Sequence, residues 1–172
     1  LYNGKRELIN GKPFLSNLCY SNPEVQEKMA DYMVQYCKEY PEVSIVSISL
    51  ADKINTLCEC ENCAGTRLSD HIINMVNVID ERLIKEGINI KVTFGAYLDS
   101  LWAPLKYKLK YPERHSVGFF PISHVYHEPL PTENIPAEEP FPYVLNKLSQ
   151  TENTAKNLSF FKAWQKQIDT DY

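Results

Sequence analysis

The sequence predicts an α/β fold with a parallel sheet built from repeated βα units. Residues 43–50 form a near-continuous apolar run with helical patterns on both sides, which is typical of a buried parallel strand. Strand-like and helix-like segments then alternate along the chain at the spacing of βα units. Four such units amount to about half of a (β/α)8 barrel, so we expect a partial, TIM-like barrel, with a small open sheet as the alternative.

The first βα unit is expected to precede this apolar run. Residues 13–20 (PFLSNLCY) are a plausible short strand. Asn22 and Pro23 then predict the start of a helix, because they supply a capping side chain and a proline at the first helical position. Apolar side chains recur at helical spacing until Pro41, and Cys37 within this helix is most simply a packing residue.

The βα pattern repeats after the apolar run. A second helix, which Ser69 can cap and which closes with Gly87, is predicted because apolar residues recur on one of its faces. Residues 88–97 and 116–122 are the next two predicted strands. The Pro-rich segment 129–142 is too long for a simple connector, so we expect it to have a function. A last helix is indicated by four apolar side chains at helical spacing: Leu158, Phe161, Trp164 and Ile168.

Composition limits the functional classes. A chain of 172 residues can bury one core, so we expect a single domain or an excised segment of a larger protein, whose remaining domains would then be partners. The formal net charge of −4 favours neither nucleic acid nor an anionic membrane as a partner. No apolar run approaches the roughly 18 residues of a membrane span. Nucleotide-binding glycine loops and the Gly-x-Ser-x-Gly elbow of serine hydrolases are also absent from the sequence.

Three cysteines follow the apolar run as Cys58-x-Cys60-x-x-Cys63. Thiolates at this spacing can wrap a structural Zn²⁺, which requires four tetrahedral ligands. Cys19 is the favoured fourth ligand because it ends the preceding predicted strand, and His71 is its rival. Disulfides and free thiols remain the alternatives. With any of these, we expect the cluster to hold a long loop in place rather than to carry out chemistry.

Three carboxylates follow predicted strands, where the chemistry of α/β proteins collects. Asp52 follows strand 43–50, Asp99 follows strand 88–97, and Glu128 lies in the loop after the fourth strand. Glycoside hydrolysis needs two carboxyl groups, one of which must keep a raised pKa. These three residues are therefore the candidate catalytic acids, although a cap or turn role also explains Asp52 and a polar loop that caps the sheet also explains Glu128.

Aromatic and histidine side chains near these acids are candidate sugar contacts. Tyr97 and Trp102 flank Asp99, and an aromatic ring packs well on the apolar face of a pyranose. His124, Tyr126 and His127 precede Glu128 and can hydrogen-bond sugar hydroxyls. Ordinary packing at the rim of the sheet is the alternative for the two aromatic residues, and a polar loop that caps the sheet is the alternative for the other three.

Several of these motifs occur together in a characteristic order. Lys5-Arg6 is followed by Leu-Cys-Tyr-Ser-Asn-Pro-Glu at 18–24, by Asp52 with the cysteine motif, by Tyr97 after a strand, and by Trp164 on the last helix. In this the chain resembles a bacterial family, domain of unknown function 4838, found in large glycoside-hydrolase-like multidomain proteins. The resemblance covers most of the chain. It implies a carbohydrate-active barrel similar to those of α-glucuronidases and β-hexosaminidases, in a secreted or cell-surface bacterial protein.

Two functional hypotheses follow. The first is a carbohydrate-active domain, a glycoside hydrolase that acts on a poly- or oligosaccharide through carboxylates at strand ends. The alternative is a non-catalytic glycan-binding or structural module with a cysteine-stapled loop. A pair of carboxylates across one cleft would favour the hydrolase. Aromatic side chains without such a pair would favour the binding module.

Overall fold

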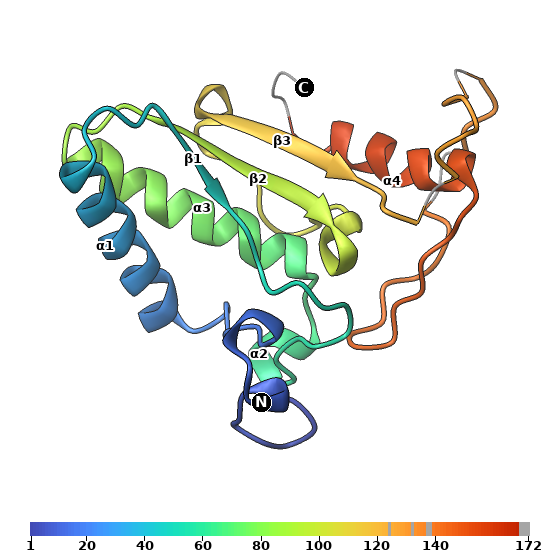
Figure 1. Ribbon diagram of the computed structural model, residues 1–172, viewed down its shortest axis with the longest axis horizontal. Coiled ribbons are helices and arrows are strands. Elements are labelled where there is room, and N and C mark those ends of the chain that lie inside the picture. Colours follow the sequence, from blue (N-terminus) through green and yellow to red (C-terminus); the bar gives the residue numbers. More distant parts are fainter. Residues whose placement is uncertain (124, 132, 137–138, 169–172) are drawn as a thin grey trace.

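The computed structural model describes all residues except 124, 132, 137–138 and 169–172 (Figure 1). Its described part is an α/β structure with three strands. Helices precede the first strand, connect it to the second and follow the third, whereas only short 3-10 turns lie between the second and third strands. The helices are α1 (Pro23–Glu39), α2 (Glu61–Ala64), α3 (Leu68–Lys85) and α4 (Thr154–Gln165), and the strands are β1 (Ile45–Ile48), β2 (Lys91–Tyr97) and β3 (His115–Phe120).

The three strands form one parallel sheet in the order β1-β2-β3. Alternate side chains of β2 point to opposite faces, as in any strand, so that Val92, Phe94 and Ala96 are buried while their neighbours are more accessible. The buried face packs against α1, α3 and α4, which all lie on the same side of the sheet (Figure 1). Among the described residues, no helix covers the other face.

Local sequence explains where the two long helices begin and end. The Asn22 side chain accepts a 3.0 Å hydrogen bond from the backbone N–H of Glu24, which confirms the predicted cap of α1. Helix α3 starts at Leu68 with Arg67 as its N-cap residue, two residues before the predicted cap Ser69, and the Asp70 carboxylate accepts a hydrogen bond from the N–H of Arg67. Gly87 follows α3 with φ +70°, a left-handed conformation that glycine adopts without strain.

The prediction of a partial (β/α)8 barrel is wrong. The described residues form an open sheet of three parallel strands, which corresponds to the alternative of a small open sheet. The expected first strand, residues 13–20, is not a strand: Pro13–Leu15 is a 3-10 turn. Proline cannot donate a ladder hydrogen bond, and Phe14 and Leu18 are 62% and 52% exposed, so of this segment's large apolar residues only Tyr20, 7% exposed, belongs to the core.

A second, smaller core joins the segment after β2 to α4. Trp102 is fully buried there, stacked edge-on against Phe160 at a centroid distance of 4.7 Å. Its indole N–H donates a 2.8 Å hydrogen bond to the carbonyl of Phe141. The end of the Pro-rich segment is therefore packed against the domain, and Glu139 in it forms a two-bond ion pair with Arg67.

The helices of the described part of the chain include none long and apolar enough to cross a membrane.

A buried charge network connects α3 to the start of β3. Asp80 is completely buried and accepts hydrogen bonds from the Arg114 guanidinium at 3.0 Å and from the ring of His115. The other ring nitrogen of His115 lies 3.1 Å from the carbonyl oxygen of Val92 on β2. This network satisfies polar groups that burial would otherwise leave unpaired, and it joins α3, β2 and β3.

Candidate functional site

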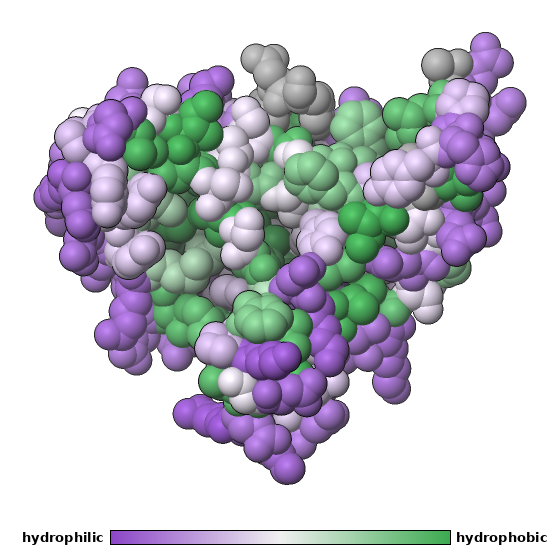
Figure 2. All heavy atoms as spheres, viewed as in Figure 1, coloured by the Kyte–Doolittle hydropathy of each residue, from purple (hydrophilic) through white to green (hydrophobic). Residues whose placement is uncertain are grey.

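The uncovered face of the sheet is organised in rows that run across the strands. The parallel register places three hydroxyl residues side by side, then two glycines, and then two aromatic residues at the carboxyl edge. Figure 2 looks onto this face and shows a recessed middle of pale, intermediate hydropathy. The rows are Ser47, Thr93 and Ser116; Gly95 and Gly118; and Tyr97 and Phe120.

The ring of Phe120 lies over the glycine row. A Cβ atom added at Gly118 would be 2.5 Å from the Cε2 and Cζ atoms of this ring, and one added at Gly95 would be 3.0 Å from its Cδ2 and Cε2 atoms. The ring can therefore rest on the sheet only because neither position carries a side chain. With 53% of its surface exposed, Phe120 presents an aromatic surface to solvent on this face.

A cleft of about 720 Å³ extends from this face to the carboxyl ends of β1 and β2. Phe120, Tyr97, Asp52 and Asp99 are among its lining residues. The Tyr97 hydroxyl donates a 2.7 Å hydrogen bond to Oδ1 of Asp52, and this bond raises the pKa of Tyr97 above its usual value. Asp52 is exposed, so the cleft has an accessible carboxylate fixed beside two aromatic rings.

Asp99 lies in a different environment from Asp52. It is only 2% exposed, and both of its carboxylate oxygens accept from the backbone N–H of Asn55, at 3.0 and 3.2 Å. Burial raises the pKa of Asp99 to about 6. The preceding residue, Leu98, has φ +48°, a left-handed conformation that is rare and strained for leucine. This turn ends β2 and directs Asp99 inward.

The structure separates the other predicted site residues from this cleft. Trp102 is fully buried, so its indole offers no face to a ligand. Glu128 and His127 are exposed on the loop after β3, where Glu128 accepts a 3.5 Å hydrogen bond from Thr154. Tyr126 is 74% exposed on the same loop. His124 lies outside the described residues. Of the eight predicted catalytic and sugar-binding residues, the described cleft lining thus brings together three: Asp52, Tyr97 and Asp99.

Phe120 is the cleft residue that the sequence interpretation missed. It ends the strand as the outward-facing member of the alternation Ser116, Gly118 and Phe120. Glycine inside a strand indicates a bulge or the close approach of another group. Because Gly95 and Gly118 both interrupt predicted strands, this signal was present in the sequence, and here the approaching group is an aromatic ring of the chain itself.

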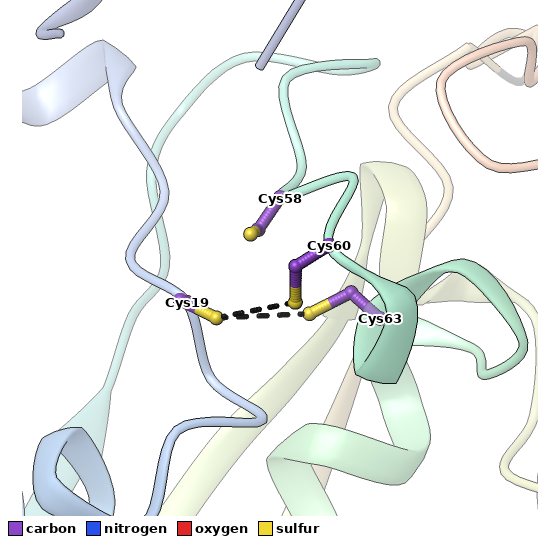
Figure 3. A group of neighbouring side chains, drawn as sticks. All are labelled: Cys19, Cys58, Cys60 and Cys63. Atoms are coloured by element: carbon purple, nitrogen blue, oxygen red, sulfur yellow. Dashed lines mark hydrogen bonds between the residues drawn. The ribbon is translucent and has the colours of Figure 1, made fainter. Parts of the chain in front are cut away.

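The four predicted metal ligands come together below the carboxyl end of β1. Cys58 and Cys60 lie in the loop after the strand, Cys63 lies on α2, and Cys19 approaches from the segment before α1 (Figure 3). Their four sulfur atoms all lie within 4.8 Å of one another. The predicted cysteine cluster, with Cys19 as its fourth member, is therefore confirmed.

The thiols of this cluster share one hydroxyl group. The Sγ atom of Cys63 donates to the Oγ atom of Ser21 at 3.1 Å, and the same oxygen lies 3.3 Å from Cys19 and 3.6 Å from Cys60. The hydrogen bond with Ser21 lowers the pKa of Cys60 to about 6, whereas burial raises that of Cys63 to about 12. His71, the rival ligand, lies outside the cluster, with its Nε2 atom 2.5 Å from the hydroxyl of Thr66.

Comparison with known proteins identifies the family. A family model described as a domain of unknown function, DUF4838, matches residues 1–162. No curated protein and no solved structure matches the chain. Because the family model spans nearly the whole sequence and includes both the cleft and the cysteine cluster, this chain belongs to the family of domain of unknown function 4838.

Proposed function

We propose that this domain binds a saccharide in the cleft at the carboxyl edge of its sheet. The observation that carries the proposal is the combination of the half-exposed Phe120 ring, seated on the glycine row, with the hydrogen-bonded pair of Asp52 and Tyr97 in the same cleft. A pyranose has an apolar C–H face and a rim of hydroxyl groups. An aromatic surface beside a carboxylate matches both parts of such a ligand.

The size and the lining of the cleft support the same class of ligand. Its volume of about 720 Å³ is in the range of small-molecule sites and is large enough for a short oligosaccharide. The hydroxyl row of Ser47, Thr93 and Ser116 lies along its floor and adds hydrogen-bonding groups. In this proposal the cysteine cluster supports the adjacent loop, as a structural zinc centre, and takes no part in ligand chemistry.

Titration calorimetry of the chain against uronic acids, hexosamines and neutral oligosaccharides tests this proposal. We expect one of these classes to bind, and we expect Phe120→Ala and Asp52→Asn each to weaken its affinity by about tenfold or more. Tyr32→Ala is the matched control, because Tyr32 is also an exposed aromatic residue, 68% exposed, but lies on α1 away from the cleft. Binding that Phe120→Ala and Asp52→Asn leave unchanged, or no binding of any class, would contradict the proposal.

Hydrolysis of the bound saccharide is a second candidate function, favoured by one observation. Asp99, with a pKa of about 6, lines the same cleft as the exposed Asp52. Glycosidases use such a division, in which a protonated acid donates to the leaving oxygen and an ionised carboxylate acts at the anomeric carbon. Release of reducing ends from the ligand, lost in both Asp52→Asn and Asp99→Asn, is the expected result. Binding of a saccharide without cleavage would contradict hydrolysis and would identify the domain as a binding module.

A further inference from the structure

We infer that Cys19, Cys58, Cys60 and Cys63 bind one Zn²⁺ ion as a closed four-thiolate centre. A tetrahedral site with Zn–S bonds of about 2.3 Å places its sulfur atoms about 3.8 Å apart. The Sγ atom of Cys19 lies 3.6 Å from that of Cys60 and 4.0 Å from that of Cys63. All four sulfurs fall within 4.8 Å of one another, so a small displacement brings them to the corners of that tetrahedron.

Disulfide pairing explains this arrangement less well than a metal does. A disulfide needs two sulfurs about 2.05 Å apart, and pairing imposes no requirement that two separate pairs share one small volume. In this structure Cys19 is nearly equidistant from two partner sulfurs, at 3.6 and 4.0 Å, and none of the four thiols forms a disulfide. Convergence of four sulfurs from two segments of the chain is what a single central ion requires.

The surroundings of the cluster indicate a structural role. Cys58 and Cys63 are only 6% and 5% exposed, and four cysteines fill a tetrahedral shell, which leaves no open position for a substrate or a reacting water. The Ser21 hydroxyl, within 3.1–3.6 Å of three of the sulfurs, is placed to donate a hydrogen bond to a metal-bound thiolate. Such partners orient metal ligands and moderate the charge of a four-thiolate site.

A zinc ion at this place would fix the two segments that form one wall of the cleft. The segment that carries Cys19 is already bonded to the loop after β1: Asn17 donates to the Thr56 hydroxyl at 3.2 Å and accepts from the N–H of Ala51 at 3.3 Å. The N–H of Asp52 donates to the carbonyl of Phe14 at 3.0 Å. These few bonds close a long loop, and a metal cross-link between the same segments would add to its order.

Metal analysis of the chain expressed with zinc in the medium tests this inference. We expect one equivalent of zinc in the wild-type chain and in Cys37→Ala, because Cys37 is a buried thiol of α1 outside the cluster. Cys60→Ser should lose the metal, whereas Cys60→His should retain it, because histidine also binds zinc in tetrahedral sites. Both substitutions change the same residue. Loss of zinc from Cys60→Ser together with retention of zinc by Cys60→His therefore reports metal ligation rather than damage to the fold.

Two further measurements make the outcome decisive. Co²⁺ in place of Zn²⁺ should give the intense absorption of a tetrahedral cobalt–thiolate centre, in wild type and in Cys37→Ala alike. Thiol titration after denaturation and metal removal should find all five cysteines of the chain reduced. A single titratable thiol would show two disulfides and would overturn the inference. Wild-type protein that contains no zinc, or equal zinc in Cys60→Ser, would also overturn it.

Discussion

The hydroxyl of Tyr97, the last residue of β2, donates a 2.7 Å hydrogen bond to the carboxylate of Asp52, which follows β1. The bond joins the ends of two neighbouring parallel strands and fixes the orientation of an exposed carboxylate at the mouth of the cleft. A carboxylate held in one orientation binds a ligand with higher affinity than one that rotates freely in water, because less side-chain entropy is lost on binding.

Tyr97→Phe removes this hydroxyl and distinguishes a role of the hydrogen bond in saccharide affinity from a role in the stability of the fold. We expect Tyr97→Phe to change the free energy of unfolding by less than about 1 kcal/mol, because Asp52 is exposed and water replaces the lost hydrogen bond. Saccharide affinity, measured by calorimetry, should fall about tenfold because Asp52 is no longer oriented. A large loss of stability in urea unfolding, with unchanged affinity, would show that the bond supports the loop and not the ligand.

The buried carboxyl of Asp99 makes a prediction for pH. Its pKa is raised to about 6, from about 3.9 in an unfolded chain, so between these values the folded state binds more protons than the unfolded state does. Stability therefore falls as the pH rises from about 4 to 6. A shift of about 2 units corresponds to about 3 kcal/mol, lost by wild type but not by Asp99→Asn, whose side chain stays neutral.

Urea unfolding of wild type and Asp99→Asn at pH 4, 5, 6 and 7 provides the measurement. Other carboxyl groups titrate in both proteins, so they cancel when the two free energies of unfolding are subtracted. The difference should shift in favour of the variant across this window and stay constant above it. A difference independent of pH would show that Asp99 is ionised in the folded protein throughout the range.

The glycine row predicts a specific effect of one methyl group. Gly118→Ala places a Cβ atom 2.5 Å from the ring of Phe120, so the ring must move away from the sheet. Because this ring is half exposed and has room to turn towards solvent, we expect a stability loss of no more than about 1 kcal/mol. Nuclear magnetic resonance of the variant should show that the Phe120 ring no longer contacts Gly95. Its saccharide affinity should also fall.

Gly65→Ala is the matched control for that substitution. Gly65 has a negative φ of −99°, and a Cβ atom there would meet nothing within 4 Å. The ring contacts of Phe120 and the affinity for saccharide should both remain as in wild type. If Gly118→Ala also left the ring contacts intact, the seating of Phe120 on the glycine row would be disproved.

The charge network behind the sheet predicts a large loss of stability. Asp80→Asn removes the carboxylate that faces Arg114 and His115, and breaking a buried ion pair on one side typically costs about 3–5 kcal/mol. The neighbouring Glu81→Gln is the control, because Glu81 is exposed and pairs with Lys110 at the surface, where the cost should be below about 1 kcal/mol. Equal effects of both substitutions in urea unfolding would contradict this assignment.

The elements that the sequence predicted well are those with strong local signals. Asn22 and Pro23 located the start of α1, and the run at 43–50 contains β1 at Ile45–Ile48. Residues 13–20 show why the barrel prediction failed. Their apolar composition is typical of a short strand, but strand pairing depends on partners distant in sequence, and this segment is bonded instead to the loop after β1.

In the candidate site, too, local sequence located some residues and not others. Cys19 was identified as the fourth member of the cluster, although the reason given, that it ends a strand, was wrong: its segment reaches the cysteine loop through hydrogen bonds to the residues after β1. Trp102 could not be placed from sequence, since its burial depends on Phe141 and Phe160, which lie about 40 and 60 residues further along the chain. Side chains whose environment is formed by distant segments are the ones that local patterns do not resolve.

The glycine row also limits how this site can vary between relatives. Where Gly95 and Gly118 cross the sheet, the floor beneath Phe120 is formed by main-chain atoms alone. A substitution at either glycine can add atoms and make the cleft shallower, but none can remove atoms and make it deeper. In the proposed saccharide site, room for a bulkier ligand would therefore have to come from the rim, by replacement of Phe120 or by rearrangement of the loop that carries Asp52.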